Sequence, residues 1–149
     1  GRPVPSLAPP PFAAAALAVD IAAGFPRDTN ATWPDAWLFY PAIAVVATTI
    51  FGLLPLAALT ALSGSRLRGR AVTGRAAALI GSTATVEPAA QVALGSALPA
   101  FVVPHVFVFG LVQLTLLRRY GYLPMLWFRV CYYLLWHVLW GEARLQLLF

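Results

Sequence analysis

Four ionisable side chains lie in strongly apolar stretches of this 149-residue chain, where they could carry acid–base chemistry or bind a metal. They are Glu87, His105, Arg129 and His137. A carboxylate and two imidazoles can move protons near neutral pH or coordinate a divalent metal, and a buried arginine can hold an anion. Ionisable groups are costly in apolar surroundings, so these residues are the first candidates for a functional site.

The spacing of three of these residues predicts a similar depth if the chain folds as antiparallel helices. Glu87 and His105 are equally distant in sequence from Ser96, and His105 and His137 are equally distant from Gly121. With a rise of about 1.5 Å per residue, Glu87 and His105 would lie about 13 Å from the turn at Ser96, close to the middle of a bilayer. The sequence therefore predicts that Glu87, His105 and His137 share one layer.

A structural interpretation competes with this chemical one. Arg129 lies about 12 Å from the turn at Gly121 by the same helical rise, within reach of Glu87, and Gln113 is level with it. A buried pair of Glu87 and Arg129 would hold two helices together and leave the glutamate a poor general base. The two histidines could likewise serve as interhelical hydrogen-bond partners. On this view Arg129 and Gln113 form a structural polar pair.

Composition predicts the elements that must position these residues. The chain is 60 % hydrophobic and only 10 % charged, too little polar surface to cover a water-soluble domain. Two runs without a charged residue, Ala36 to Leu62 and Pro88 to Leu117, exceed the roughly 20 residues that span a bilayer core. Lipid excludes unpaired backbone groups, and the pattern does not alternate as barrel strands do. We therefore expect an all-α, polytopic transmembrane helical bundle.

The predicted bundle has about four spanning helices, each about 20 residues or longer. Their expected ranges are 36–62, 76–94, 97–117 and 122–140 within a transmembrane domain at 36–149. Residues 1–35 are proline-rich and then polar, and we expect them to be the end of a fragment followed by a loop on the outer side. Within them, Asn30-Ala31-Thr32 matches a glycosylation sequon.

The arginines predict the orientation of the bundle. The net charge of +5 comes entirely from arginine, without lysine. The cluster from Arg66 to Arg75 and the pair Arg118 and Arg119 are expected in the cytoplasm by the positive-inside rule. Because these residues lie in short connections between apolar runs and form no exposed stripe, the lipid bilayer is an expected partner and nucleic acid is not. The oligomeric state is unknown from the sequence.

Several motifs in the second half of the chain are similar to those of a known family. "FVVPH" (101–105) has the form FxxxH, and "RRYGYLPMLWFRVCYYLLWH" (118–137) has arginine, tyrosine and glycine before a helix that carries His137. "TVEPAAQ" (85–91) resembles a worn EExxxR motif with Glu87 as its remaining glutamate. Over about residues 76–141 the sequence thus resembles the CPBP family, the CAAX proteases and bacteriocin-processing proteins, which are polytopic intramembrane proteases.

The resemblance implies a peptidase with Glu87, His105 and His137 as catalytic residues and a membrane peptide as substrate. The glutamate would take a proton from water, while the histidines would orient that water or stabilise the oxyanion. Any divalent metal at the site, such as zinc, would be held by the same three residues. The resemblance also implies a bacterial or archaeal cell membrane and a family core that is incomplete at its N-terminus.

The sequence departs from the family pattern at three positions. Pro88 stands in place of the second glutamate, Gln91 in place of the arginine, and Gly141 in place of the asparagine or aspartate that follows the last histidine. A degenerate, inactive relative of the proteases is therefore one hypothesis. A non-enzymatic membrane scaffold or accessory subunit is a second, and a transporter fragment is a third.

Overall fold

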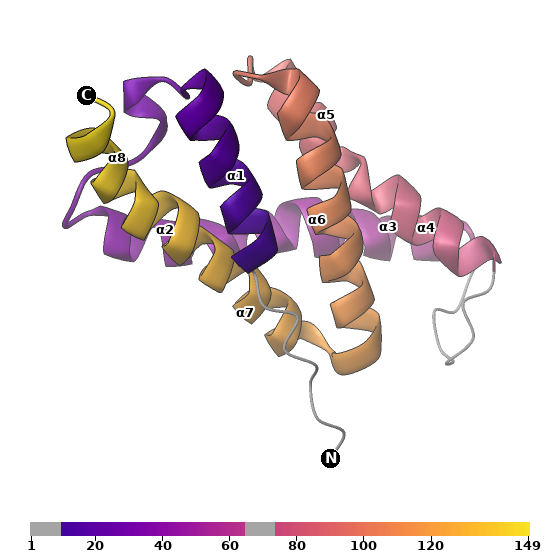
Figure 1. Ribbon diagram of the computed structural model, residues 1–149. Helices are drawn as coiled ribbons and strands as arrows, with labels where there is room; N and C mark the ends of the chain where they lie inside the picture. Colours follow the sequence, from indigo (N-terminus) through magenta and orange to yellow (C-terminus); the bar gives the residue numbers. More distant parts are fainter. Residues whose placement is uncertain (1–9, 65–73) are drawn as a thin grey trace. The chain divides into compact units, whose positions relative to one another are not determined.

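The fold is all-α, as the sequence predicted. The computed structural model describes residues 10–64 and 74–149, which form helices and loops without a β-strand (Figure 1). Arg66, Arg68 and Arg70 of the predicted cytoplasmic cluster lie outside the described residues. The chain divides into two compact units, the first made of residues 1–45 and 126–149 and the second of residues 46–125. The predicted boundary between residues 35 and 36 stays a prediction.

Among the described residues, two helices are long and apolar enough to cross a membrane. One runs from Ala36 to Leu62 and consists of α2 (Ala36–Ala47), the π-helical segment η2 (Thr48–Leu53) and α3 (Leu54–Leu62). The other is α6 (Pro99–Tyr120). Only 28 % of the most apolar stretch of each helix is buried inside the chain. The exposed large apolar side chains include Leu38 and Leu54 in the first helix and Val103 and Val108 in α6.

The other two predicted spans consist of shorter elements. α4 (Gly74–Ala84) is followed by α5 (Val86–Ala93), and α7 (Tyr122–Tyr133) is followed by the π-helical segment η3 (Leu134–Trp140) and by α8 (Gly141–Leu147). Wider π-helical turns interrupt the regular α-helical hydrogen bonding and often lie at functional positions. The helices are thus found where the sequence predicted them, while their crossing of a membrane stays a prediction.

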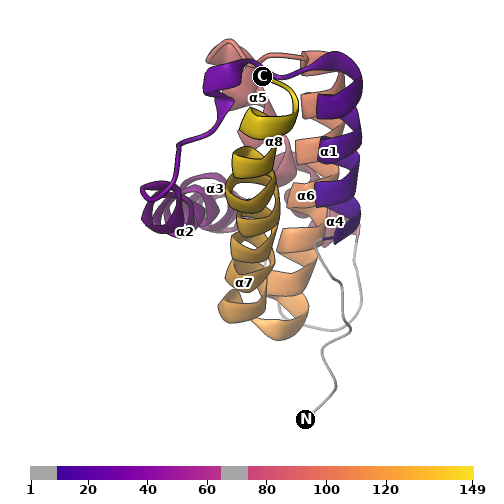
Figure 2. The same ribbon diagram turned by 60° about the vertical axis from the view of Figure 1, so that its left-hand side comes forward.

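The first unit begins with a helix that the sequence did not predict, α1 (Pro10–Ala23). Its alanine-rich sequence has high helix propensity, and Ala13 and Ala16 are buried. α1 packs against η3 and lies beside α8 (Figure 2). The ring of Phe12 meets that of Phe128 edge-on, with their centroids 5.8 Å apart. A loop with one 3-10 turn, η1 (Arg27–Thr29), leads from α1 to α2. α1 therefore lies before the polar loop expected at residues 26–35, in the segment for which the sequence predicted no helix.

The second unit is built on α6, against which α4 and α5 pack (Figure 1). Thr83 and Ala84 of α4 are buried, and a Cβ atom placed on Gly110 would lie 3.4 Å from the Cβ atom of Ala84. Small residues allow two helices to approach this closely. The turn from α5 to α6 uses positive φ angles at Gly95 (82°) and Leu98 (53°), which reverse the chain direction.

Candidate functional site

The four candidate residues are divided between the two units. Glu87 on α5 and His105 on α6 belong to the second unit, whereas Arg129 on α7 and His137 on η3 belong to the first. The predicted layer of Glu87, His105 and His137 joins residues of both units, as does the predicted pairing of Arg129 with Glu87. Both arrangements therefore stay predictions.

Glu87 and His105 lie on the two helices that flank the turn at Ser96. Glu87 is in the first turn of α5 and is buried, and α5 packs against α6. On α6, one turn after Phe101, the His105 ring lies 4.8 Å from the phenyl ring at an interplanar angle of 35°. Both residues also take part in other interactions within the chain. The antiparallel hairpin that the depth argument requires is present in this unit.

His137 is held by a residue that the sequence analysis did not assign to the site, Asn30. The Nδ1 atom of His137 lies 2.7 Å from the Oδ1 atom of Asn30. The imidazole stacks on the ring of Tyr40 at 4.4 Å and 10°, and the ring of Tyr133 meets it edge-on at 5.1 Å and 86°. Because an amide oxygen only accepts hydrogen bonds, this pairing places a proton on Nδ1, and in the neutral imidazole the lone pair is then on Nε2.

Gly141 leaves the space that the Asn30 side chain occupies. A Cβ atom at position 141 would lie 3.1 to 3.2 Å from the Nδ2, Cβ and Cγ atoms of Asn30. Gly141 is also the position at which the sequence departs from HxxxN. In the structure an asparagine amide therefore reaches His137 from the loop after α1, and the glycine permits its approach.

The burial of Asn30 argues against its sequon as a glycosylation site. The residue is only 8 % exposed, and its Nδ2 atom, the atom that would carry a glycan, is buried without a hydrogen-bond partner. A glycan on Nδ2 would require the loop to leave the His137 ring. The more informative feature of this asparagine is its unpaired amide donor.

The most extensive polar network in the first unit joins Asp20 of α1 to Arg144 of α8, and the sequence analysis missed it. The Nε and Nη2 atoms of Arg144 donate to the two carboxylate oxygens of Asp20 at 2.7 and 2.9 Å, and both side chains are fully buried. The indole N–H of Trp140 and the backbone N–H of Phe25 also donate to this carboxylate, at 2.7 and 2.8 Å. Arg144 further donates to the carbonyl oxygens of Phe25 and Pro26 at 2.6 and 3.0 Å.

This network changes the acidity of Asp20. Burial alone raises the pKa of the carboxyl group, but the hydrogen bonds from Arg144, Phe25 and Trp140, together with the charge of Arg144, outweigh it and lower the pKa below its usual 3.8. Asp20 is thus held as a carboxylate. The available sequence signal was a single acid in an alanine-rich segment and a single arginine in a short, mainly apolar tail that also contains Glu142.

Arg129 and Gln113 each have a partner within their own unit. The Nη1 atom of Arg129 donates to the hydroxyl of Tyr133 at 3.2 Å, and its guanidinium carbon lies 5.8 Å from the centre of that ring. The Nε2 atom of Gln113 donates to the carbonyl oxygen of Met125 at 3.2 Å, which ties the end of the second unit to α6. The predicted contact between Arg129 and Gln113 joins the two units and stays a prediction.

A metal site needs several ligands in one place. Among the described residues of either unit, no three His, Cys, Asp or Glu side chains are grouped as such a site requires. Within the described residues, neither unit by itself therefore contains a set of ligands for the zinc ion that the family resemblance suggests.

Comparison with known proteins found no relative of this chain. The chain matches no protein-family model, no curated protein sequence and no solved structure. Function is therefore argued from the residues themselves.

Proposed function

We propose that this chain is an integral membrane protein that acts as a scaffold or accessory subunit, with buried polar side chains fastening its helices. The network of Asp20 and Arg144 carries this proposal, because it ties α1 to α8 with a buried ion pair whose charges are met by hydrogen bonds. Arg129 and His137 also have aromatic or amide partners in their own unit. Contacts of this kind hold neighbouring helices together.

The membrane location is supported by the exposed apolar side chains of the helix from Ala36 to Leu62. Leu38, Val46 and Leu54 of the helix from Ala36 to Leu62 are 81 %, 45 % and 59 % exposed. Water would make such a surface costly, whereas lipid would cover it. We extend the proposal to four spans, with residues 74–93 and 122–140 as the remaining two and with Arg75, Arg118 and Arg119 in the cytoplasm.

Extraction of membranes tests the location. Vesicles from cells that express the chain would be washed with alkaline carbonate, which removes peripheral proteins and leaves spanning ones. We expect the chain to remain in the membrane pellet and to be released only by detergent. Release by carbonate alone would contradict the proposal.

A second candidate function is a membrane peptidase resembling the CPBP family. The contact between Asn30 and His137 favours it, since an amide fixes the imidazole with a lone pair on Nε2. Glu87, buried on α5 opposite α6, would be the group that takes a proton from water. The candidate requires His105 and His137 to approach Glu87, and its substrate would be a peptide in the membrane.

A cleavage assay separates the two candidates. The purified chain in detergent would be incubated with quenched fluorescent membrane peptides. A peptidase would lose essentially all activity on Glu87→Gln, by a factor of at least about 100 for the loss of a general base. Glu142→Gln, an exposed glutamate of α8, would be the matched control. The scaffold proposal expects no cleavage with any of the three proteins.

A further inference from the structure

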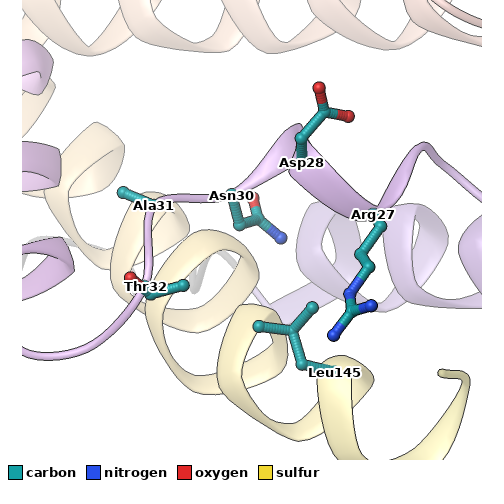
Figure 3. Close-up of a pocket in the computed structure, with 6 residues that line it drawn as sticks. All are labelled: Arg27, Asp28, Asn30, Ala31, Thr32 and Leu145. Atoms are coloured by element: carbon teal, nitrogen blue, oxygen red, sulfur yellow. The ribbon is translucent and has the colours of Figure 1, made fainter.

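An open pocket of about 520 Å³ lies in the first unit beside the unpaired amide of Asn30 (Figure 3). Its lining comes from the loop between α1 and α2 and from α8, and consists of Arg27, Asp28, Asn30, Ala31, Thr32 and Leu145. The Asn30 side chain is more than nine-tenths buried, yet its Nδ2 atom has no hydrogen-bond partner. A buried donor without an acceptor is costly, and a ligand oxygen would remove that cost.

The charges around this pocket favour an anionic ligand. Figure 3 shows the guanidinium of Arg27 extending toward Leu145, with the amide nitrogen of Asn30 turned to the same space. The carboxylate of Asp28 points away from both. Two N–H donors, one of them cationic, therefore flank a space whose remaining walls include the apolar side chains of Ala31 and Leu145.

We propose that this pocket binds a phosphate group, held by the guanidinium of Arg27 and by the Nδ2 amide of Asn30. The Nδ2 atom has almost no accessible surface in the unliganded chain, and a small rotation of the amide exposes it to the ligand. The planar guanidinium presents paired N–H donors that match two phosphate oxygens, and the amide supplies a further donor from the buried side. The apolar walls suit a phosphate that carries an apolar chain.

The loop that carries the pocket is already fixed in place. Arg144 donates to the carbonyl oxygens of Phe25 and Pro26, immediately before Arg27, and the backbone N–H of Ala31 donates to the Tyr40 hydroxyl at 2.8 Å. Asp20 neutralises Arg144, so the positive charge offered to a ligand is that of Arg27. A site held in its binding geometry loses little entropy when the ligand arrives.

The phosphate could come from a lipid headgroup or from solution. A lipid source rests on the proposed membrane location, whereas binding of free phosphate does not. The membrane location and the phosphate pocket can therefore be refuted independently of each other. Carbonate extraction tests the location, and a binding assay in detergent tests the pocket.

The experiment uses the full chain in a maltoside detergent, which carries no phosphate. Inorganic phosphate would be titrated by calorimetry, and phosphatidylglycerol added to the micelles would be detected on the protein by native mass spectrometry. We expect one bound phosphate group per chain with at least one of the two probes. Phosphatidylglycerol alone would identify a lipid site, and inorganic phosphate would identify a general phosphate site.

Arg27→Gln and Arg119→Gln form a matched pair, since both arginines are exposed and both changes remove one positive charge. Arg27→Gln should weaken binding about tenfold or more, as expected for the loss of a charged hydrogen bond, while Arg119→Gln should bind as the unchanged chain does. Leu145→Trp, which fills the pocket, should abolish binding. The proposal is overturned if neither probe binds, if Arg27→Gln loses no more than Arg119→Gln, or if Leu145→Trp binds normally.

Discussion

The buried ion pair of Asp20 and Arg144 is the clearest case in which single residues define this structure. Removing two charges from water is expensive, and their mutual attraction repays the cost only when the remaining polar atoms are also satisfied. Here the carboxylate accepts from Arg144, Trp140 and Phe25. Loss of one partner should therefore be far more damaging than loss of a surface charge.

We predict that Asp20→Asn lowers the free energy of unfolding by about 3 to 5 kcal/mol, the usual cost of leaving a buried charge without its partner. The neutral amide removes the counter-charge and turns an N–H group toward the donors of Arg144. Thermal unfolding in detergent, followed by tryptophan fluorescence, would measure the loss. Glu142→Gln, on the same helix as Arg144 but exposed, should change stability by less than about 0.5 kcal/mol.

The same carboxylate predicts how stability depends on pH. Since the folded chain lowers the pKa of Asp20 below 3.8, the folded state favours the ionised form. Its stabilising contribution is complete above the unfolded pKa and is lost as the pH falls through the folded pKa. The melting temperature should therefore decline more steeply below about pH 4 in the unchanged chain than in Asp20→Asn. Parallel curves for the two proteins would contradict the assignment.

For His137, the sequence identified the candidate residue but not its partner. Its residue type in an apolar helix made it a candidate, but its partner Asn30 lies 107 residues earlier, in the loop after α1. Spacing arguments compare positions within one helix or across one turn, and they do not reach a contact between distant segments. The partner of Arg144 was missed for the same reason.

At the scale of helices, the sequence predicted where each helix begins and ends better than it predicted the hydrogen-bonding pattern within the helix. The apolar run from Ala36 to Leu62 is a helix over that same range, and α6 begins at Pro99 and ends at Tyr120, near the predicted 97–117. Hydrophobicity and terminal residues such as Gly121 mark such boundaries. The π-helical segments η2 and η3 were not predicted, because wider turns depend on local packing that periodicity does not encode.

Substitution of Gly141, at the start of α8, tests the contact between that helix and the loop that carries Asn30. We predict that Gly141→Ala destabilises the chain, because its new methyl group would meet the Asn30 side chain at 3.1 to 3.2 Å and push it from His137. Gly81→Ala is the control, since nothing lies within 4 Å of a Cβ atom placed there in α4. The control should gain up to about 1 kcal/mol of stability from helix propensity. Equal melting temperatures for the two variants would contradict the prediction.

At the scale of the whole molecule, composition predicted the all-α fold more directly than any motif did. Few charges and long apolar runs predicted helices long and apolar enough to span a membrane, and two such helices are present among the described residues. The shared layer of Glu87, His105 and His137 is a different kind of prediction, because it needs the joint geometry of two units. Helix rise fixes depth along an axis but leaves rotation and lateral position open.

The proposed topology can be tested with single cysteines, because Cys131 is the only natural one. In a Cys131→Ser background, cysteine would be placed at Arg75, Ser96 or Arg119 and exposed to a membrane-impermeant maleimide on intact cells. Four spans with cytoplasmic arginines predict labelling of Ser96→Cys from outside, and of the two arginine positions only after permeabilisation.

Each result of this labelling bears on a particular helix. Ser96 and Arg119 lie near opposite ends of α6, so labelling of both from the same side would show that α6 does not cross. Arg75 lies at the start of α4, and its labelling from outside together with Ser96→Cys would remove α4 and α5 from the spans. Labelling on opposite sides for both pairs would set Glu87 and His105 between the two membrane surfaces, which the shared layer with His137 requires.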